Sequence, residues 1–370
     1  GLGDVYKRQP VTLEVPVDLF TEEVDGLLLD TYRSPARSAP VADMTQLSTL
    51  AKRILIAQKP VIIAGQGILY GQACDELLAL AELTGIPVIS TLNGKSCFPE
   101  NHSLSLGCAG GSRPDPLNHF LDQADLIIGL GTSFTRSDYI TPFPTQDREF
   151  TQLTNCEQDI GHDYPVDLAI IGDAKPSISA LITILSTQSG KFTGRRDTVE
   201  KEIAGLKSAF ASQWDALLNS DEKPINPYRV INDLMKILDR NRAVVTHDAG
   251  SPRDQVTAFY EAIVPHGYIG WGKTTQLGMG LGLVQGAKLA RPDWQGVNIM
   301  GDAAIGMVGM DFETGVRNQI GTTTIVLKNS VMGGYSEYHP NASRKYNIEA
   351  LGGNYADLAK SLGGHGERVE

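Results

Sequence analysis

The sequence predicts an α/β protein with two doubly wound parallel-sheet domains. Short apolar strands alternate with amphipathic helices along most of the 370 residues, a pattern typical of parallel sheets covered by helices on both faces. The 41% hydrophobic content is ample for more than one buried core. Polar, Gly-rich or Pro-rich stretches interrupt the alternation, which indicates two nearly whole domains preceded by a remnant of another.

The N-terminal segment predicts a leader followed by one isolated strand. Residues 1–9 lack an initiator Met, the layout of a signal peptide and any regular period, so we interpret them as a foreign leader or assembly scar. Residues 11–19 (VTLEVPVDL) alternate apolar and polar side chains, which predicts a strand that closes an absent domain. We assign 1–33 to this leader and remnant. We expect the chain to be cut at its C-terminal end, residues 363–370, as well.

A central α/β domain is predicted over 41–188, after the linker sequence SPARSAP. Apolar runs of four or five residues predict its strands, and apolar residues at helical spacing predict its helices. The predicted elements are helices over 44–56, 74–84, 116–123 and 175–185, and strands over 61–64, 88–91, 126–130, 151–155 and 168–172.

The remaining chain predicts a linker with a helix and then a second α/β domain. We assign 189–225 to the linker, because a polar, Gly-rich stretch precedes an amphipathic helix over 197–218 and the sequence DEKPINP follows it. The last domain, 226–370, begins with a helix over 228–238 and a strand over 243–246.

Composition and charge exclude several classes of function. The net charge is −11 and no run of five or six Lys and Arg occurs, so we expect no nucleic-acid partner. No apolar stretch reaches the ~18 residues that a membrane span needs, so we expect a soluble, cytoplasmic protein. The cysteines match no zinc or disulfide spacing and are interpreted as reduced, buried thiols; they are Cys74, Cys97, Cys108 and Cys156.

Two glycine-rich segments resemble phosphate-binding motifs without matching their context. Residues 65–71 (GQGILYG) follow a strand, but the last gap is one residue longer than a dinucleotide loop allows, and no acidic residue ends the next strand. Residues 267–274 (GYIGWGKT) match the P-loop pattern, with Asp302 as a candidate acid. Pro265 precedes this second segment and several glycines follow it, so a P-loop NTPase remains a distant alternative.

A third segment predicts a metal and phosphate site. Asp302 ends an apolar strand in the sequence GDAA, and Asn329 follows the apolar strand TTIVL 27 residues later. Two neighbouring parallel strands that end in these residues would bring two oxygen ligands together at the carboxyl edge of the sheet, where α/β proteins bind ligands.

This spacing, with the HDAG turn at 247–250 and the GMGLGL run at 278–283, resembles the diphosphate-binding domain of thiamine diphosphate enzymes. Residues 59–107 and 163–175 resemble the central domain of the acetolactate synthase family. The segment VTLEVPVDL is similar to the closing strand of that family's first, pyrimidine-binding domain. The likeness covers nearly everything from Pro10 onward.

The resemblance implies a site for thiamine diphosphate and Mg²⁺. The side chains of Asp302 and Asn329 and the carbonyl of Val331 would be metal ligands. The carbonyl of Thr275 would hold the pyrimidine amino group, and Leu277 would keep the cofactor folded, although a core leucine is the alternative. The other implied cofactor contacts are Asp248, Gly250, Ser251, Gly301, Ala303, Ala304 and Gly333.

Two departures from the family pattern limit the assignment. Ser251, Pro252 and Arg253 replace the Gln and His usual in the synthases, and residues 131–138 lack the acidic pattern expected for a structural FAD. We therefore assign no flavin. The activating Glu of the family belongs to the first domain of a partner subunit, so we assign no catalytic residue to this chain and expect it to be inactive alone.

The resemblance implies a carboligase that decarboxylates a 2-oxoacid such as pyruvate and transfers the acyl unit to a second carbonyl. A 2-oxoacid decarboxylase, an acyl-CoA lyase and a catalytically inactive relative remain alternatives on the same scaffold. The implied partners are a small 2-oxoacid substrate and, in the full-length protein, further copies of the chain in a homodimer or homotetramer.

Overall fold

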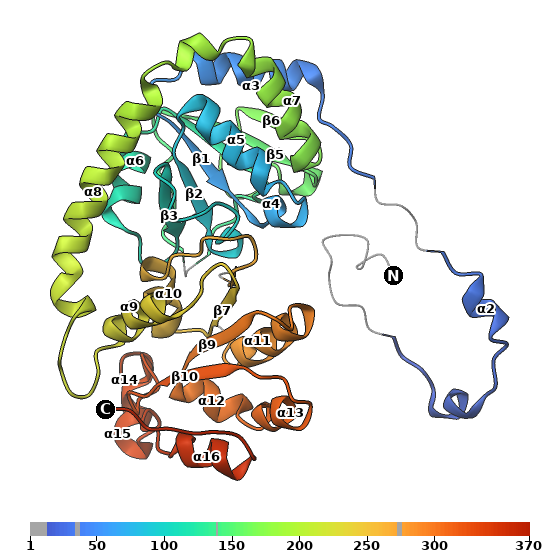
Figure 1. The fold of residues 1–370 in the computed structure, drawn as a ribbon, viewed down its shortest axis with the longest axis vertical. Helices are drawn as coiled ribbons and strands as arrows, with labels where there is room; N and C mark the ends of the chain where they lie inside the picture. Colours follow the sequence, from blue (N-terminus) through green and yellow to red (C-terminus); the bar gives the residue numbers. More distant parts are fainter. Residues whose placement is uncertain (1–12, 34–37, 138–139, 272–275) are drawn as a thin grey trace. The chain divides into compact units, whose positions relative to one another are not determined.

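The computed structural model describes residues 13–33, 38–137, 140–271 and 276–370 (Figure 1). The chain divides into two compact units, Gly1–Ser38 and Ala39–Glu370. Both predicted sheets belong to the second unit. The predicted fold class is confirmed, because this unit contains a six-stranded and a four-stranded parallel sheet.

The strand predicted over 11–19 is wrong for the residues that the structure describes. Residues 13–16 have no regular structure, and a short 3₁₀ helix, η1, spans Val17–Thr21. A four-residue helix, α2, follows at Leu27–Asp30. The apolar side chains of Leu13, Val17 and Phe20 are exposed. An alternating strand needs a neighbouring strand and a core to cover its apolar face, and the described part of this unit supplies neither.

The six-stranded sheet has the strand order of a doubly wound fold. All its neighbouring strands are parallel, and the order reverses between β1 and β4. In spatial order the strands are β3 (Ser105–Ala109), β2 (Val88–Thr91), β1 (Pro60–Ala64), β4 (Leu126–Leu130), β5 (Glu149–Thr154) and β6 (Leu168–Ile171). The sequence analysis missed β3, because Ser105 and Gly107 interrupt its apolar run.

Helices cover both faces of this sheet (Figure 1). On one face lie α3 (Met44–Ile56), α5 (Cys74–Thr84) and α7 (Ala174–Ser186), and on the other lie α6 (Asp115–Gln123) and the long α8 (Arg195–Leu218). Asp43 fixes the start of α3 by accepting hydrogen bonds from the amides of Thr45 and Gln46. The shorter helices are α4 (Gln66–Tyr70), η2 (Leu92–Gly94), η3 (Glu157–Asp159) and η4 (Ser189–Phe192).

The four-stranded sheet is also parallel throughout. In spatial order its strands are β10 (Thr323–Leu327), β9 (Gln295–Gly301), β7 (Ala243–His247) and β8 (Tyr268–Ile269). The chain leaves β7 for β8 on one side and then crosses to β9 on the other, so the order reverses between β7 and β9. Ligands of α/β sheets bind outside the carboxyl ends of the strands at such a point.

Alternating residues of the second sheet face different helices. Val245, Val297 and Ile299 pack in one core with Val256 and Tyr260, which come from α10 (Ser251–Phe259) and the residue after it. Thr246 and Asn298 lie on the opposite face, next to α11 (Met279–Ala290). The remaining helices are α9 (Pro227–Ile237), α12 (Asp302–Val308), α13 (Asp311–Arg317), α14 (Tyr335–Tyr338), α15 (Pro340–Tyr346) and α16 (Tyr355–Ser361).

All four cysteines lie among the described residues, and none of them forms a disulfide. Cys97, Cys108 and Cys156 are buried and Cys74 is half-buried, close to the prediction of reduced, buried thiols. Burial raises the pKa of Cys74 and that of Cys108 to about 12. Within the described residues, no helix combines the length and apolar composition needed to cross a bilayer.

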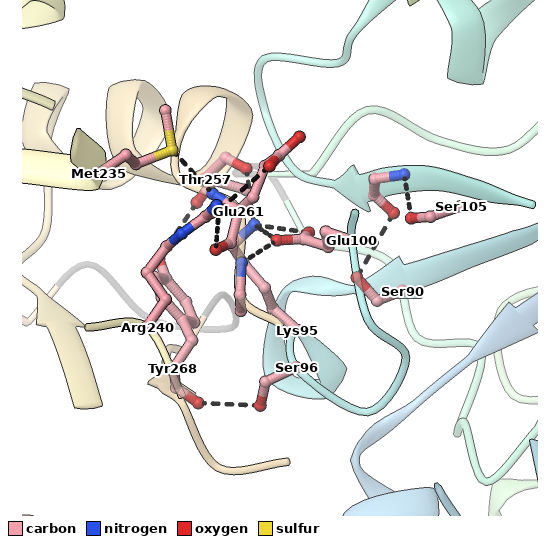
Figure 2. A network of polar contacts seen from close by, with 12 residues as sticks. Ser90, Lys95, Ser96, Glu100, Ser105, Met235, Arg240, Thr257, Glu261 and Tyr268 are labelled. Atoms are coloured by element: carbon pink, nitrogen blue, oxygen red, sulfur yellow. Dashed lines mark hydrogen bonds and ion pairs between the residues drawn. The ribbon is translucent and has the colours of Figure 1, made fainter. Parts of the chain in front are cut away.

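A buried ion pair joins the two sheets (Figure 2). Lys95 and Glu100 lie in the loop between β2 and β3, and the Lys95 ammonium is 2.6 Å and 2.5 Å from the two Glu100 carboxylate oxygens. Lys95 also donates to the carbonyl of Thr257 in α10. The carboxylate of Glu100 accepts from the amide of Ala262, whose carbonyl accepts from the amide of Glu100.

The same loop contacts the strand β8. The Lys95 ammonium lies 5.3 Å from the centre of the Tyr268 ring, and the Ser96 hydroxyl donates to the Tyr268 carbonyl. Burial raises the pKa of Glu100, against the opposing effect of the Lys95 charge. Lys95 and Glu100 are only 2% and 5% exposed, so neither charge has water to replace a lost partner.

We expect Glu100→Ala to lower the free energy of unfolding by about 3–5 kcal/mol, because it leaves the Lys95 charge buried without its carboxylate. Urea denaturation of both proteins measures the difference. Glu313→Ala is the matched control, since Glu313 pairs with Arg317 on the surface and its loss should cost at most about 1 kcal/mol. Equal effects of the two substitutions would contradict this account of the ion pair.

Candidate functional site

The candidate residues gather around one broad cavity at the carboxyl ends of β7, β9 and β10. The cavity has a volume of about 2330 Å³, more than the roughly 300–1,000 Å³ of ordinary small-molecule sites. Asp248 does not line it, and Thr275 lies outside the described residues. The predicted residues that line it are Gly250, Ser251, Leu277, Gly301, Asp302, Ala303, Ala304, Asn329, Val331 and Gly333.

Asp302 and Asn329 follow paired strands, as the sequence analysis expected. Gly301 and Leu327 are register partners at the ends of β9 and β10, so the residues that follow them leave the sheet together. The carboxylate of Asp302 accepts hydrogen bonds from the amide of Ser330 at 2.7 Å and from the amide of Ala303 at 3.2 Å. The Asp302 carboxylate therefore lies beside the Asn329–Ser330 turn.

Backbone contacts hold the turn after β10 in place. The Asn329 side-chain oxygen accepts from the amide of Val331 at 3.1 Å, and Val331 forms an isolated antiparallel bridge with Ala350. The flanking hydrogen bonds use the carbonyl of Ser330 and the amide of Met332, so they do not engage the carbonyl of Val331. Val331 is 43% exposed, which leaves it accessible from the cavity that it lines.

Tyr355 supports the start of α12 from a distant part of the chain. Its hydroxyl lies 3.2 Å from the carbonyl of Asp302 and 2.9 Å from that of Gly352. The single hydroxyl proton can donate to either carbonyl. Sequence reasoning missed Tyr355, because no local pattern indicates that a residue at the start of α16 reaches back to the start of α12.

The chemistry of this donor set suits a hard cation. A carboxylate, a side-chain amide oxygen and a backbone carbonyl are oxygen ligands of the kind that Mg²⁺ prefers. Among the described residues, no three His, Cys, Asp or Glu side chains come together as a metal-binding group. The predicted set contains only one carboxylate, so a cation held here needs further oxygen ligands from a bound anion or water.

Two helix N-termini reach the same cavity. Gly250 precedes α10 and Gly301 precedes α12, and neither helix has a side-chain cap at its N-terminus. Ala303 and Ala304 stand in the first turn of α12, where small side chains let an anion approach the amides. Gly250 has φ +86°, a left-handed conformation that favours glycine at this turn.

The carboxylate of Asp248 faces inward. One oxygen accepts from the amides of Ala249 and Gly278, both at 2.9 Å, and the other accepts from the amide of Gly280 at 3.1 Å. Asp248 is 0% exposed, and burial raises its pKa against the effect of these amides. Asp248 thus joins the turn after β7 to the start of α11.

Leu277 has both a packed side and an open side. It is partly buried and packs against Met300, Ala304 and Ile305, the buried residues where β9 leads into α12. It also lines the cavity. The packed side is that of a core leucine, and the open side faces the cavity, so the role as a support for the cofactor stays a prediction.

His247 lies under the site, and sequence reasoning assigned it no role. The residue is 0% exposed, and its ring stacks on Trp271 with 4.2 Å between the ring centres. Its Nδ1 is 3.0 Å from the carbonyl of Asp248, and its Nε2 is 3.3 Å from the amide nitrogen of Trp271. Burial lowers the pKa of His247 to about 4, so the ring is neutral at neutral pH.

The other two glycine-rich segments have structural explanations in the described residues. A Cβ on Gly65 or Gly67 would lie 2.3 Å or 2.7 Å from the carbonyl oxygen of Gly131, so these glycines let two loops touch. In the P-loop-like segment, β8 lies inside the motif and α11 begins only at Met279. A P-loop requires a strand before the motif and a helix directly after it.

The chain matches the two characteristic domains of one enzyme family. Residues 47–181 match the model described as thiamine pyrophosphate enzyme, central domain, and residues 248–370 match the C-terminal TPP binding domain of thiamine pyrophosphate enzymes. These ranges contain the six-stranded sheet and most of the four-stranded sheet.

Several curated proteins are similar over most of this chain. The probable acetolactate synthase large subunit of Methanocaldococcus jannaschii is 29% identical over 88% of this chain and 55% of its own length. The probable acetolactate synthase large subunit of Methanococcus aeolicus is 27% identical over 98% of this chain and 63% of its own length. A probable acetolactate synthase of Mycobacterium bovis is 31% identical over 90% of this chain and 58% of its own length. The chain thus spans about three fifths of the length of these relatives.

Gly280 tests the packing beneath the site. A Cβ there would lie 2.3 Å from the Asn298 side-chain oxygen and 2.5 Å from the carbonyl oxygen of His247. We expect Gly280→Ala to lower the free energy of unfolding by about 1–3 kcal/mol. Gly282→Ala, in the same helix with no atom near its Cβ, should raise it by about 0.5–1 kcal/mol. Urea denaturation measures both values, and changes of the same sign would refute the packing described.

His247 predicts a pH dependence of stability. The unfolded chain takes up a proton on this residue below pH 6.5, whereas the folded chain does so only near pH 4. The free energy of unfolding should therefore fall by about 3 kcal/mol as the pH drops through this window. Urea denaturation of the wild type and His247→Gln at several pH values isolates the contribution of His247 to the free energy of unfolding. Parallel plots of this free energy against pH for the two proteins would show that His247 contributes nothing.

Proposed function

Because the chain belongs to the thiamine pyrophosphate enzymes, we propose that it binds thiamine pyrophosphate, also called thiamine diphosphate, together with Mg²⁺. The observation that carries the proposal is the meeting of Asp302 with the Asn329–Ser330 turn at the ends of β9 and β10. An uncapped helix N-terminus lies at the same place. Oxygen ligands beside a helix N-terminus are what a metal-bound diphosphate requires.

The cation would be held by the side chains of Asp302 and Asn329 and by the carbonyl of Val331. Support comes from the burial of Asp302, which is 3% exposed, and from the two backbone amides that orient its carboxylate. A fixed carboxylate loses little conformational freedom when it binds a cation. The exposed Asn329 completes the set from the cavity side.

The diphosphate would lie between the turns that follow β7 and β9. Gly301, Ala303 and Ala304 would approach it on one side and Gly250 and Ser251 on the other, each next to the start of a helix. Gly333, whose surroundings are open, borders the same space. Asp248 would act indirectly. It joins the turn after β7 to α11 by accepting hydrogen bonds from the amides of Gly278 and Gly280.

When bound, thiamine diphosphate supplies a nucleophilic carbon and accepts the electrons released when a 2-oxoacid loses CO₂. Leu277 would support the middle of the cofactor, since it lines the cavity while resting on Met300 and Ala304. The carbonyl of Thr275 remains our candidate for the pyrimidine amino group. These residues position the cofactor and exclude water from it.

The reaction that we propose is an acetolactate-synthase-like carboligation of a 2-oxoacid such as pyruvate. Its support is the identity of 27–31% with acetolactate synthases over most of this chain. A 2-oxoacid decarboxylase, an acyl-CoA lyase and an inactive relative are the other candidates on this scaffold. Product analysis of the full-length protein with pyruvate, thiamine diphosphate and Mg²⁺ separates them: acetolactate supports the proposal, acetaldehyde identifies a decarboxylase, and the absence of any product identifies an inactive relative.

We propose that a further copy of the protein covers the open side of the cavity. Three methionines in or next to the helices α11 and α12 are exposed, Met279 by 38%, Met307 by 59% and Met310 by 67%, and exposed apolar side chains favour protein contact. The Glu that activates the pyrimidine would come from this partner. Analytical ultracentrifugation, with and without cofactor, measures the assembly.

We expect Asp302→Ala to weaken Mg²⁺-dependent binding of thiamine diphosphate by about 100-fold or more, because it removes the charged ligand of the cation. Isothermal titration calorimetry measures the affinity. Asn329→Ala should also weaken binding, by a smaller factor, because it removes a neutral ligand.

Asp311→Ala is the matched control for these two variants. Asp311 is an exposed carboxylate at the start of α13, and its removal changes the net charge by the same amount as that of Asp302. We expect unchanged cofactor affinity in this variant. Undiminished binding by Asp302→Ala would rule out the metal site, whereas an equal loss in Asp302→Ala and Asp311→Ala would indicate a general effect of charge.

A further inference from the structure

His247 and Asp248 hold both ends of one chain segment. The imidazole Nε2 of His247 lies 3.3 Å from the amide nitrogen of Trp271. The carboxylate of Asp248 accepts the amides of Gly278 and Gly280. The segment from Trp271 to Gly280 contains Leu277, which lines the proposed cofactor cavity. The last residue of β7 and the residue after it thus contact the chain at Trp271 and at the start of α11.

The two hydrogen bonds of His247 require one tautomer. The carbonyl of Asp248 can only accept, so Nδ1, at 3.0 Å, carries the proton. The amide of Trp271 can only donate, so Nε2 presents its lone pair. A protonated ring, or the tautomer with the proton on Nε2, would direct an N–H group at the Trp271 amide. Only the neutral ring with its proton on Nδ1 satisfies both neighbours.

The surroundings of the ring favour this state. The Trp271 and Tyr268 rings stack on the imidazole, and the positive charges of Arg253 and Lys95 oppose its protonation. A Cβ on Gly270 would lie 2.9 Å from Nε2, so a glycine at this position gives the imidazole room to reach the Trp271 amide. The charge, the stacking and the space all support a neutral, fixed ring.

We propose that His247 is a positioning residue for the cofactor site: its neutral imidazole, protonated on Nδ1, ties the amide of Trp271 to the carbonyl of Asp248. The residue does not line the cavity. It acts through Asp248, whose carboxylate accepts the amides of Gly278 and Gly280 and so keeps the first turn of α11 in register with the turn after β7. The geometry of this inference comes from the described contacts, whereas its effect on cofactor binding rests on the proposed function.

The first test is the tautomer itself. Long-range ¹H–¹⁵N NMR correlation of the wild-type chain, labelled with ¹⁵N-histidine, distinguishes the two ring nitrogens of His247. We expect a protonated Nδ1 and an unprotonated Nε2 at every pH between 5 and 8. A residue that only fills space has no reason to hold one tautomer. The Nε2-protonated form, or titration near the ordinary pKa of histidine, would overturn the proposal.

The second test compares three substitutions. His247→Asn places a side-chain N–H near the Nδ1 position, His247→Gln places an oxygen near the Nε2 position, and His247→Phe keeps the ring but neither hydrogen bond. We expect amide exchange at Gly278 to speed up about tenfold in His247→Phe, the effect of a hydrogen bond worth about 1.4 kcal/mol. The other two variants should show smaller increases, because each keeps one bond.

Cofactor affinity and controls complete the design. Calorimetry with thiamine diphosphate and Mg²⁺ should show about tenfold weaker binding by His247→Phe and an unchanged affinity for His119→Gln, a substitution at an imidazole on the surface of α6. Unchanged exchange at Gly278 in His247→Phe would refute the positioning role. If the wild type binds no cofactor, the proposed function falls, while the tautomer and the exchange rates still decide the role of His247.

Discussion

The ion pair between Lys95 and Glu100 is the interaction on which the arrangement of the two sheets depends. Two charges removed from water need partners in one particular geometry, and here those partners come from both domains. The Lys95 ammonium meets the carbonyl of Thr257, and Glu100 exchanges hydrogen bonds with Ala262. Thr257 belongs to α10, the helix that starts at the turn after β7, where we propose that the diphosphate binds. The orientation of that helix is therefore set from the central domain.

The parallel sheet explains why the candidate site lies at some distance from this pair. The strands of the second sheet end at the same edge, and the order reversal between β7 and β9 separates the loops that leave them. Asp248 and Asp302 follow these two strands with opposite tasks. Asp248 is enclosed by backbone amides, whereas Asp302 lines the cavity. One carboxylate stabilises the scaffold, and the other is the ligand that we propose for a cation.

The sequence predicted elements whose residues meet a core locally, and it failed where the fold depends on distant partners. The helix over 44–56, the helix over 74–84 and the strand over 126–130 match to the residue, because their apolar spacing directly reports a buried face. The strand β8 has only two residues, too few for any period. The predicted strand over 11–19 had a suitable alternation and no described neighbour to pair with.

The candidate site divides in the same way. The proximity of Asp302 and Asn329 followed from the rule that neighbouring parallel strands end at one edge. The roles of His247, Tyr355 and the inward-facing Asp248 depend on contacts across 24 to 53 positions of the chain, and single-sequence patterns carry no such information. The glycines around Gly65 resembled a nucleotide-binding loop in the sequence. The close contact of Gly65 with Gly131 explains them by steric need alone.

The buried thiols make this protein a convenient background for site-specific labelling. With a pKa of about 12, Cys74 and Cys108 present only about one thiolate in 10⁵ at neutral pH, and the backbone covers Cys97 and Cys156. Maleimide dyes and spin labels react with thiolates. A single cysteine introduced on the exposed face of α8 can therefore carry a probe of the surroundings of that helix without prior removal of the native four.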